Sequence, residues 1–305
     1  MKLHLDAHGP FAAFDLPSGR IPLPNNALLD PTTDRVNIYV FDSNNPVANA
    51  GPDQNQCTPF TTATMAGSNV TFPATGTWTL ISGSGTIVSA NSPTTSITGL
   101  GVGANVFQWS VNNGPCGAPT TDQVTINIFD QNAQPANAGP DQSICSTSSS
   151  TTLTGNAPVG SATGTWTIVS GTGNITSPSS ATTTITGLVP GTVVCRWTIN
   201  NGSCGSSSDD VTILIYNNNN PVANAGPDQS LCTPTTSATL AGSNVLAPAV
   251  GTWTVVQGTG VFANANSPTT GVTGLSVGQN TFRWTVNNGP CASGTTNDLV
   301  NIFLF

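Results

Sequence analysis

The chain has 305 residues, of which 6% are charged and 37% are hydrophobic, and its formal net charge is −8. Nucleic acids and anionic membrane surfaces are bound through clustered Lys and Arg, so a chain with five such residues is not expected to bind either partner. Low charge would suit a disordered chain, but the hydrophobic content and the regular spacing of tryptophan indicate folded domains.

The first 42 residues differ from the rest of the chain. Residues 1–33 contain neither Trp nor Cys, and they include no apolar run long enough for a signal peptide. The next segment, Asp34–Phe41, matches the closing segment Asp298–Phe305, so we expect an irregular leader that ends in the closing strand of a preceding repeat. This match predicts that the chain is a slice of a longer protein or one subunit of a polymer. No segment approaches a membrane span.

Three copies of one sequence unit follow the leader. The motif ProValAlaAsnAlaGlyProAspGln, or a close variant of it, begins at Pro46, Pro135 and Pro221. A unit of this length is too long for a solenoid repeat and long enough for a small independent domain. We therefore divide the chain into repeats at residues 43–130, 131–217 and 218–305.

Each repeat has the pattern of a series of short strands. Apolar residues alternate with polar ones over 107–111 and again over 124–128, which is the period of a half-buried strand. An Asn–Gly pair at Asn113 favours a turn between these two antiparallel strands. With the shorter segments upstream, we expect about seven strands and no helix per repeat. The fold class is therefore all-β, with tandem immunoglobulin-like Greek-key β-sandwiches that short linkers hold in an extended rod.

Six tryptophans recur at two positions of the repeat. They are Trp78, Trp109, Trp166, Trp197, Trp253 and Trp284. Each lies in phase with aliphatic neighbours on its strand, so we predict that all six pack in the cores between the sheets. An exposed indole could instead stack on a sugar ring, and glycan binding would require one exposed tryptophan in every repeat.

Six of the seven cysteines follow the same period. Cys57 and Cys116, Cys145 and Cys204, and Cys232 and Cys291 form three pairs, each with a separation of 59 residues. Equal spacing predicts one disulfide within each repeat, which would clamp one pole of the sandwich and stabilise it by roughly 4 kcal/mol on the chain-entropy model. Metal binding would need cysteine ligands two to four residues apart, and these pairs do not have that spacing. Disulfides imply an oxidising, extracytoplasmic location.

The seventh cysteine, Cys195, stands where the other repeats have Phe107 and Phe282. We expect it to fill core space as a small hydrophobic side chain.

No cofactor is expected, although calcium is a weak candidate. Aspartates recur in the motif turn, at the start of the closing strand and in a linker; the candidate ligands are Asp53, Asp122, Asp130, Asp141, Asp210, Asp228 and Asp298. Calcium takes oxygen ligands and often lies at the junctions of extracellular sandwiches. Against this reading, Glu is absent from the chain, and Asp side chains commonly cap turns through their own hydrogen bonds.

The repeats offer no catalytic residues. Both histidines, His4 and His8, lie in the leader, so a histidine base is absent from every repeat. Asp209 and Asp210 are adjacent, but neighbours along a strand point to opposite faces and cannot act as a pair. We therefore predict that the protein is not an enzyme.

The motif ValAlaAsnAlaGlyProAspGln, with the downstream GlyThrTrp, ThrGlyLeu and TrpThrValAsnAsnGlyProCys, resembles the PKD-like and Ig-like repeats of very large surface proteins in Bacteroidota. These proteins include gliding-motility adhesins exported by the type IX secretion system. The resemblance covers about residues 43–305. It implies a β-sandwich fold, an extracellular location attached to the cell surface, and a role as a stalk, filament or adhesive array.

The leading hypothesis is thus a non-enzymatic structural or adhesive segment of a secreted bacterial cell-surface protein. Its expected partners are other copies or domains of the same protein, with surface glycans or other cells as further candidates. One alternative is a discrete filament subunit, in which Asp34–Phe41 completes a neighbouring chain by strand addition. Another is an array of glycan-binding modules.

Overall fold

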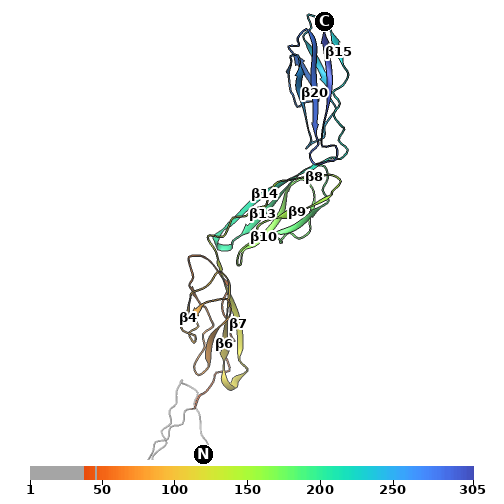
Figure 1. The fold of residues 1–305 in the computed structure, drawn as a ribbon. Coiled ribbons are helices and arrows are strands. Elements are labelled where there is room, and N and C mark those ends of the chain that lie inside the picture. Colours follow the sequence, from red (N-terminus) through yellow and green to blue (C-terminus); the bar gives the residue numbers. More distant parts are fainter. Residues whose placement is uncertain (1–37, 45–46) are drawn as a thin grey trace, which may run out of the picture.

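The computed structural model describes residues 38–44 and 47–305. It contains three β-sandwiches joined end to end in an extended, bent arrangement (Figure 1). In the described ranges each repeat has seven strands, and a four-stranded sheet faces a three-stranded sheet across the core. The predicted all-β fold is confirmed.

The strands follow the same order in every repeat. Repeat 1 contains β1 (Gln54–Cys57), β2 (Ala63–Thr64), β3 (Thr75–Ser82), β4 (Thr86–Ile87), β5 (Ser96–Thr98), β6 (Gly103–Asn112), the 3-10 turn η1 (Gly114–Cys116) and β7 (Thr120–Phe129). Repeat 2 contains β8 (Gln142–Cys145), β9 (Ser150–Thr154), β10 (Thr163–Ser170), β11 (Asn174–Ile175), β12 (Thr182–Thr186), β13 (Gly191–Asn200), η2 (Gly202–Cys204) and β14 (Ser206–Tyr216). Repeat 3 contains β15 (Gln229–Leu231), β16 (Ser237–Ala241), β17 (Val250–Gln257), β18 (Val261–Phe262), β19 (Thr269–Thr273), β20 (Gly278–Asn287) and β21 (Thr295–Leu304).

The larger sheet sets the direction of each repeat. In repeat 1 its strand order is β1-β7-β6-β3, with β6 and β7 as an antiparallel hairpin that turns at η1. Strand β1 runs parallel to the end of β7 and pairs Cys57 with Phe129. We call the end that carries the hairpin turn the incoming pole, and the end where the closing strand stops the outgoing pole.

A pair of tryptophans forms the centre of every core. Trp78 and Trp109 lie directly opposite each other on β3 and β6, with ring centroids 5.0 Å apart. A Cβ atom on Gly76 would lie 2.1 Å from the Trp109 ring, so the GlyThrTrp motif leaves room for the indole. All six tryptophans are at most 2% exposed. Because none of them can present a ring to a sugar, the tryptophan-platform version of glycan binding is wrong.

Cys195 occupies the core position of a phenylalanine. Like Phe107 and Phe282 in the other repeats, it is fully buried. Burial raises the pKa of its thiol to about 11, because the thiolate would lose its hydration. Cys195 is therefore a neutral packing residue.

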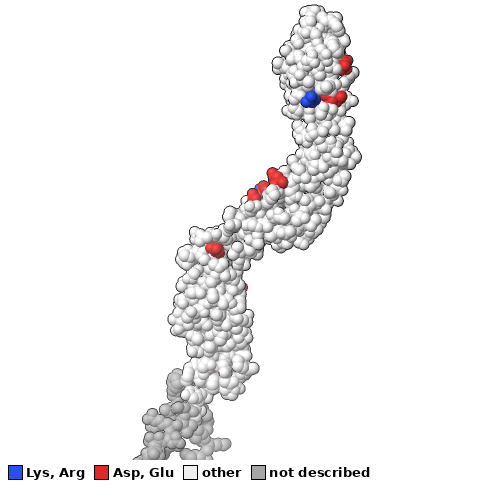
Figure 2. Space-filling model, viewed as in Figure 1, with Lys and Arg blue, Asp and Glu red and all other residues white. Residues whose placement is uncertain are grey.

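The surface is almost free of charge. Figure 2 shows isolated red and blue patches on an otherwise uncharged rod. Among the described residues the only cations on Lys or Arg side chains are those of Arg196 and Arg283. No helix in the described ranges is long and apolar enough to cross a membrane.

The structure describes only the last five residues of the leader, 38–42. His4, His8 and the first four residues of Asp34–Phe41 lie outside the described residues. The described remainder, 38–41, is assigned to no strand, and the expectation that Asp34–Phe41 closes a preceding repeat stays a prediction. In repeat 3 the place that an added strand would take, between β15 and β20, is filled by the chain's own β21.

Candidate functional site at the repeat junctions

Disulfides join neighbouring repeats. Cys57, at the outgoing pole of repeat 1, is bonded to Cys204 in the hairpin of repeat 2, with the two Cα atoms 5.2 Å apart. Cys145 of repeat 2 is bonded in the same way to Cys291 of repeat 3, with a Cα separation of 4.9 Å. The sequence separations of 147 and 146 residues make two long, overlapping loops. Closing each loop lowers the conformational entropy of the unfolded chain, which raises its free energy by about 5 kcal/mol on the chain-entropy model.

This pairing corrects the prediction of one disulfide within each repeat, in which Cys57 pairs with Cys116, Cys145 with Cys204, and Cys232 with Cys291. In repeat 1, Cys57 pairs with Phe129 at the end of β7, whereas Cys116 lies in the turn before β7 begins. The ten residues of β7 put these cysteines roughly 30 Å apart at about 3.3 Å per residue, and a disulfide requires Cα atoms within about 7 Å.

The two free exposed cysteines follow from the same geometry. Cys116 and Cys232 have no disulfide partner in the described part of the chain, and the buried Cys195 is likewise free.

The closing strand of one repeat ends on the hairpin of the next. The Asn201 side chain donates a hydrogen bond to the carbonyl of Asp130, at 2.8 Å. The Sγ atom of Cys204 lies 3.4 Å from the carbonyl oxygen of Phe129. At the second junction Asn288 donates to Asn217 at 3.0 Å in the equivalent way. The same hairpin residues thus hold both the backbone and the disulfide.

An aromatic ring covers a glycine at each of these hairpins. Gly202 has φ +52°, and a Cβ atom there would lie 2.3 Å from two carbons of the Phe129 ring. Tyr216 covers Gly289 in the same way, with the corresponding distance at 2.6 Å. Glycine is required twice over, since the left-handed backbone disfavours other residues and the ring occupies the space of a side chain.

The linkers are tied to the repeats that they leave. The Gln131 amide donates to the Thr58 hydroxyl at 2.9 Å, and the Asn218 amide donates to the Ser146 hydroxyl at 2.9 Å. Thr58 and Ser146 directly follow the bonded cysteines Cys57 and Cys145. Each linker therefore has its own anchor next to the disulfide, which restricts hinge motion.

The second junction also contains a buried amide pair. Asn220 and Asn288 are 6% and 1% exposed, and the Asn220 side chain donates to the Asn288 side-chain oxygen at 2.9 Å. Asn220 also accepts a hydrogen bond from the Leu246 amide at 2.9 Å. These contacts lie where the sequence has an asparagine run in place of the aspartate of the first junction.

The motif aspartates bind backbone amides far along the chain. Asp53 accepts a hydrogen bond from the Thr125 amide at 2.7 Å, and its counterparts Asp141 and Asp228 do the same for the closing strands of repeats 2 and 3. Each carboxylate therefore bridges the opening segment and the closing strand. These three aspartates do not cap their own turn, where the Gly51 amide donates instead to the Asn49 side-chain oxygen.

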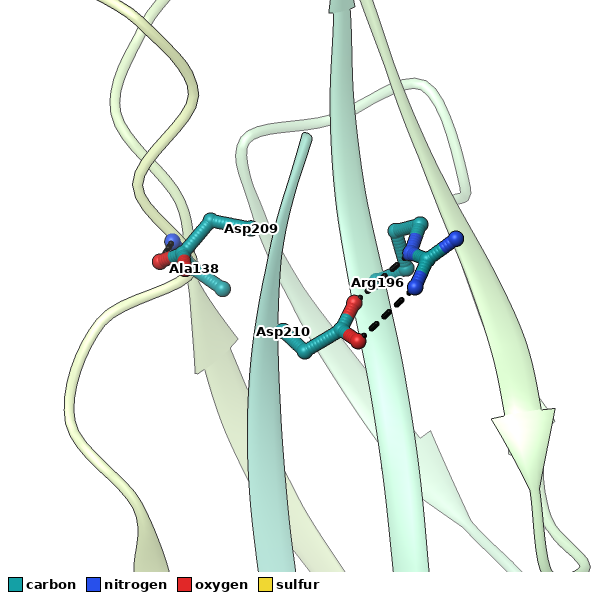
Figure 3. Close-up of polar contacts among 4 residues, drawn as sticks. All are labelled: Ala138, Arg196, Asp209 and Asp210. Carbon is teal, nitrogen blue, oxygen red and sulfur yellow. Dashed lines mark hydrogen bonds and ion pairs between the residues drawn. The ribbon is translucent and has the colours of Figure 1, made fainter. Parts of the chain in front are cut away.

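The second set of aspartates includes Asp209 and not Asp210. Asp122 and Asp298 accept hydrogen bonds from the amides of Ala50 and Ala225. In repeat 2 the equivalent acceptor is Asp209, which binds the Ala138 amide at 2.8 Å (Figure 3). Counting a fixed period from Asp122 points to Asp210, but the hairpin of repeat 2 is one residue shorter.

Asp210 forms an exposed ion pair on the opposite face of β14 (Figure 3). Its carboxylate accepts hydrogen bonds from Nε and a terminal nitrogen of Arg196, at 2.7 and 2.9 Å. These bonds lower the pKa of Asp210 and raise that of Arg196. The two neighbouring aspartates thus have different hydrogen-bond partners, and they point to opposite faces as predicted.

The remaining calcium candidate, Asp130, accepts a hydrogen bond from the Asn132 amide within the linker. Within the described residues, no three His, Cys, Asp or Glu side chains gather closely enough to hold a metal ion.

Sequence reasoning missed the hairpin residues that form the junctions. A signal was available, since the pattern Asn-Gly-x-Cys recurs at Asn113, Asn201 and Asn288. A turn between strands explains the Asn–Gly pair but gives no reason for an adjacent cysteine in every copy. The hairpin must contact the end of the preceding closing strand and also supply a cysteine for the disulfide. These two requirements together explain the whole pattern.

Comparison with known proteins finds a similarity to PKD domains within repeat 2. Residues 138–215 match the family model described as the K319L-like PKD domain. The search for curated relatives returned no match to the chain. Domains of this family are usually non-catalytic, and tandem arrays of them are typical of extracellular adhesive or structural segments.

Several solved structures are similar to parts of the chain. The PKD domain from the KIAA 1837 protein is 34% identical over 27% of this chain and 83% of its own, with a TM-score of 0.24. The PKD domain from human KIAA0319 is 19% identical over 27% of this chain and 78% of its own, with a TM-score of 0.23. The complex of Dpr2 Ig1-Ig2 with DIP-Theta Ig1-Ig3 matches at 15% identity over 85% of this chain and 100% of the other, with a TM-score of 0.45.

Proposed function

We propose that the chain is a load-bearing, non-enzymatic stalk segment of a secreted bacterial cell-surface protein. The observation that carries the proposal is the position of the disulfides between the repeats. A disulfide within a domain protects that domain alone. A disulfide across a junction adds a second covalent connection where a chain of domains would otherwise hinge.

Two covalent lines cross repeat 2. One enters along the backbone from Phe129 and leaves at Cys145 through its disulfide. The other enters through Cys204 and leaves along the eleven residues of β14 to Tyr216. Strands β8 and β14 run parallel as neighbours at the outgoing pole. A pulling force therefore passes along two covalent segments, and the residues between Cys145 and Cys204 lie outside both.

Such a repeat cannot lengthen much under tension. Unfolding of the residues outside the two lines adds no length between neighbouring repeats, because those residues lie in neither covalent path. An undivided domain chain lengthens by up to about 3.5 Å per unfolded residue. The proposed role is therefore that of a stiff tether that holds its length when single domains open.

Single-molecule pulling tests this role. One handle is attached at the N-terminus and the other at the Cys232 thiol, in a Cys116→Ser variant that leaves Cys232 as the exposed thiol. The bond between Cys57 and Cys204 removes 147 residues from the path between the handles, or about 500 Å at roughly 3.4 Å per residue.

The matched control carries serine at all four bonded cysteines. We expect the oxidised chain to release about 500 Å less on complete unfolding than this control. Equal release from both chains would refute the load-bearing proposal.

The finer assignment rests on the sequence resemblance to Bacteroidota surface repeats. The resemblance supports a location outside the cell, attached to the surface, with other domains of the same protein as partners. The sparse charge on the face drawn in Figure 2 supports a spacer more than a specific electrostatic binding site. Antibody labelling of intact cells that express the native protein tests the location.

A further inference from the structure

Cys116 and Cys232 occupy the two halves of the junction site. Cys116 lies in the hairpin of repeat 1 at the position of the bonded Cys204, and Cys232 follows β15 at the position of the bonded Cys57. Both are exposed and free. They lie at opposite ends of the array, one on an incoming pole and one on an outgoing pole.

The outgoing pole of repeat 3 has the geometry of the two poles that form junctions. The Thr233 amide donates to the Phe305 carbonyl at 2.9 Å, as Thr58 does to Phe129 at 2.9 Å. Phe305 therefore takes the place of Phe129, whose ring covers the glycine of the next hairpin. The cysteine and the aromatic ring that form a junction are thus both present at this pole.

The incoming pole of repeat 1 already holds the end of a preceding segment. The carbonyl of Asp42 accepts a hydrogen bond from the Asn113 side chain at 2.8 Å, and the carbonyl of Phe41 lies 3.5 Å from the Cys116 sulfur. A Cβ atom on Gly114 would lie 2.5 Å from the Phe41 ring. These contacts match those of Phe129 and Asp130 at the first junction.

We propose that Cys232 forms a further junction disulfide with another repeat of this kind in the same polypeptide. The partner of Cys232 is the cysteine of an Asn-Gly-x-Cys hairpin in a repeat that follows Phe305. The seating of Phe41 and Asp42 by their own chain favours a contiguous repeat over a second copy, which would have to displace them.

The bond forms by thiol–disulfide exchange. Two protein thiols and one molecule of a low-molecular-weight disulfide, such as glutathione disulfide, give the protein disulfide and two molecules of the small thiol. The protein cysteines are oxidised, the small disulfide is reduced, and the protein protons pass to the released thiolates. This inference concerns covalent connectivity and stands apart from the load-bearing role.

The test extends the full chain by one repeat. A second copy of residues 217–305 is placed directly after Phe305, since Phe305 takes the place of Tyr216 in the repeat. The added copy has serine at its own counterpart of Cys232, so one new acceptor cysteine is introduced. The chain is oxidised with glutathione, and its disulfides are mapped by peptide mass spectrometry.

We expect Cys232 to be bonded to the hairpin cysteine of the added repeat. Its alkylation should fall about tenfold or more relative to an extended chain whose added hairpin cysteine is serine, because the linker supplies a high local concentration. The bond between Cys145 and Cys291 in the same molecule reports that oxidation and folding succeeded. An alkylatable Cys232 beside that intact bond would overturn the proposal.

The unextended chain tests the alternative source of the partner. Under the same oxidant it should remain monomeric on a non-reducing gel. A ladder that contains a Cys116 to Cys232 cross-link would show that a second copy supplies the partner, and it would overturn the assignment to the same polypeptide.

Discussion

Replacing Gly202 by alanine should open the first junction without unfolding either repeat. The new Cβ atom would lie 2.3 Å from two carbons of the Phe129 ring, so the ring must leave its place. Phe129 is 7% exposed, and exposing such a ring costs about 1.5–3 kcal/mol. The left-handed φ of +52° adds about 1–2 kcal/mol for a residue with a side chain.

Together these terms weaken the closed junction by about 2.5–5 kcal/mol, which moves its disulfide by roughly 55–110 mV toward easier reduction. The assay is the fraction of Cys57 bonded to Cys204 over a series of glutathione redox buffers, read by peptide mapping. The bond between Cys145 and Cys291 is an internal reference that should not move.

The matched control is Gly205→Ala. Gly205 also has a left-handed φ, +99°, but no other atom lies within 4 Å of its Cβ position. We expect this variant to lose stability because alanine disfavours a positive φ, while the Phe129 ring stays in place. An equal shift for both variants, or no shift for the Gly202 variant, would refute the role of the ring on the glycine.

Two further predictions follow from neighbouring residues with different surroundings. Asp209→Ala should destabilise repeat 2 by about 1–3 kcal/mol, because a backbone amide loses its acceptor. Asp210→Ala removes only an exposed ion pair and should leave the melting temperature nearly unchanged. Calorimetry of the two variants measures the difference. A thiol reagent at pH 8 should label Cys116 and Cys232 in the folded chain and reach Cys195 after denaturation only, since burial raises the pKa of that thiol to about 11. Rapid labelling of Cys195 in the native chain would contradict its place in the core.

The strands and the tryptophan core could be predicted because they depend on local patterns. Alternation with a period of two fixes which side chains face inward, and Trp78 and Trp109 lie in phase with their neighbours. The glycines on the indole faces could not be assigned a partner from sequence, because Gly67 and Gly76 contact Trp109 only after the strands pair. Their recurrence indicates a packing constraint but does not show which side chain imposes it.

The disulfide partners could not be chosen from spacing. A repeated pairing rule gives equal or nearly equal separations whether each cysteine bonds within its repeat or one repeat further along. What decides is the length of β7, since its ten residues hold Cys116 at one pole and the partner of Cys57 at the other. The assignment of Asp210 failed for a related reason, because the hairpins differ in length and a fixed period slips by one residue in repeat 2.

The position of the disulfides changes what a repeat contributes to the array. Bonds within each repeat would leave a single peptide linker at every junction and no cysteine unpaired at the ends. Bonds between repeats give every junction two covalent connections and leave one exposed cysteine at each end, Cys116 and Cys232. The same rule can then be applied at those ends without altering any repeat. Because the surface carries little charge, the stiffness of such an array must come from these junctions, and electrostatic repulsion along the rod adds little to it.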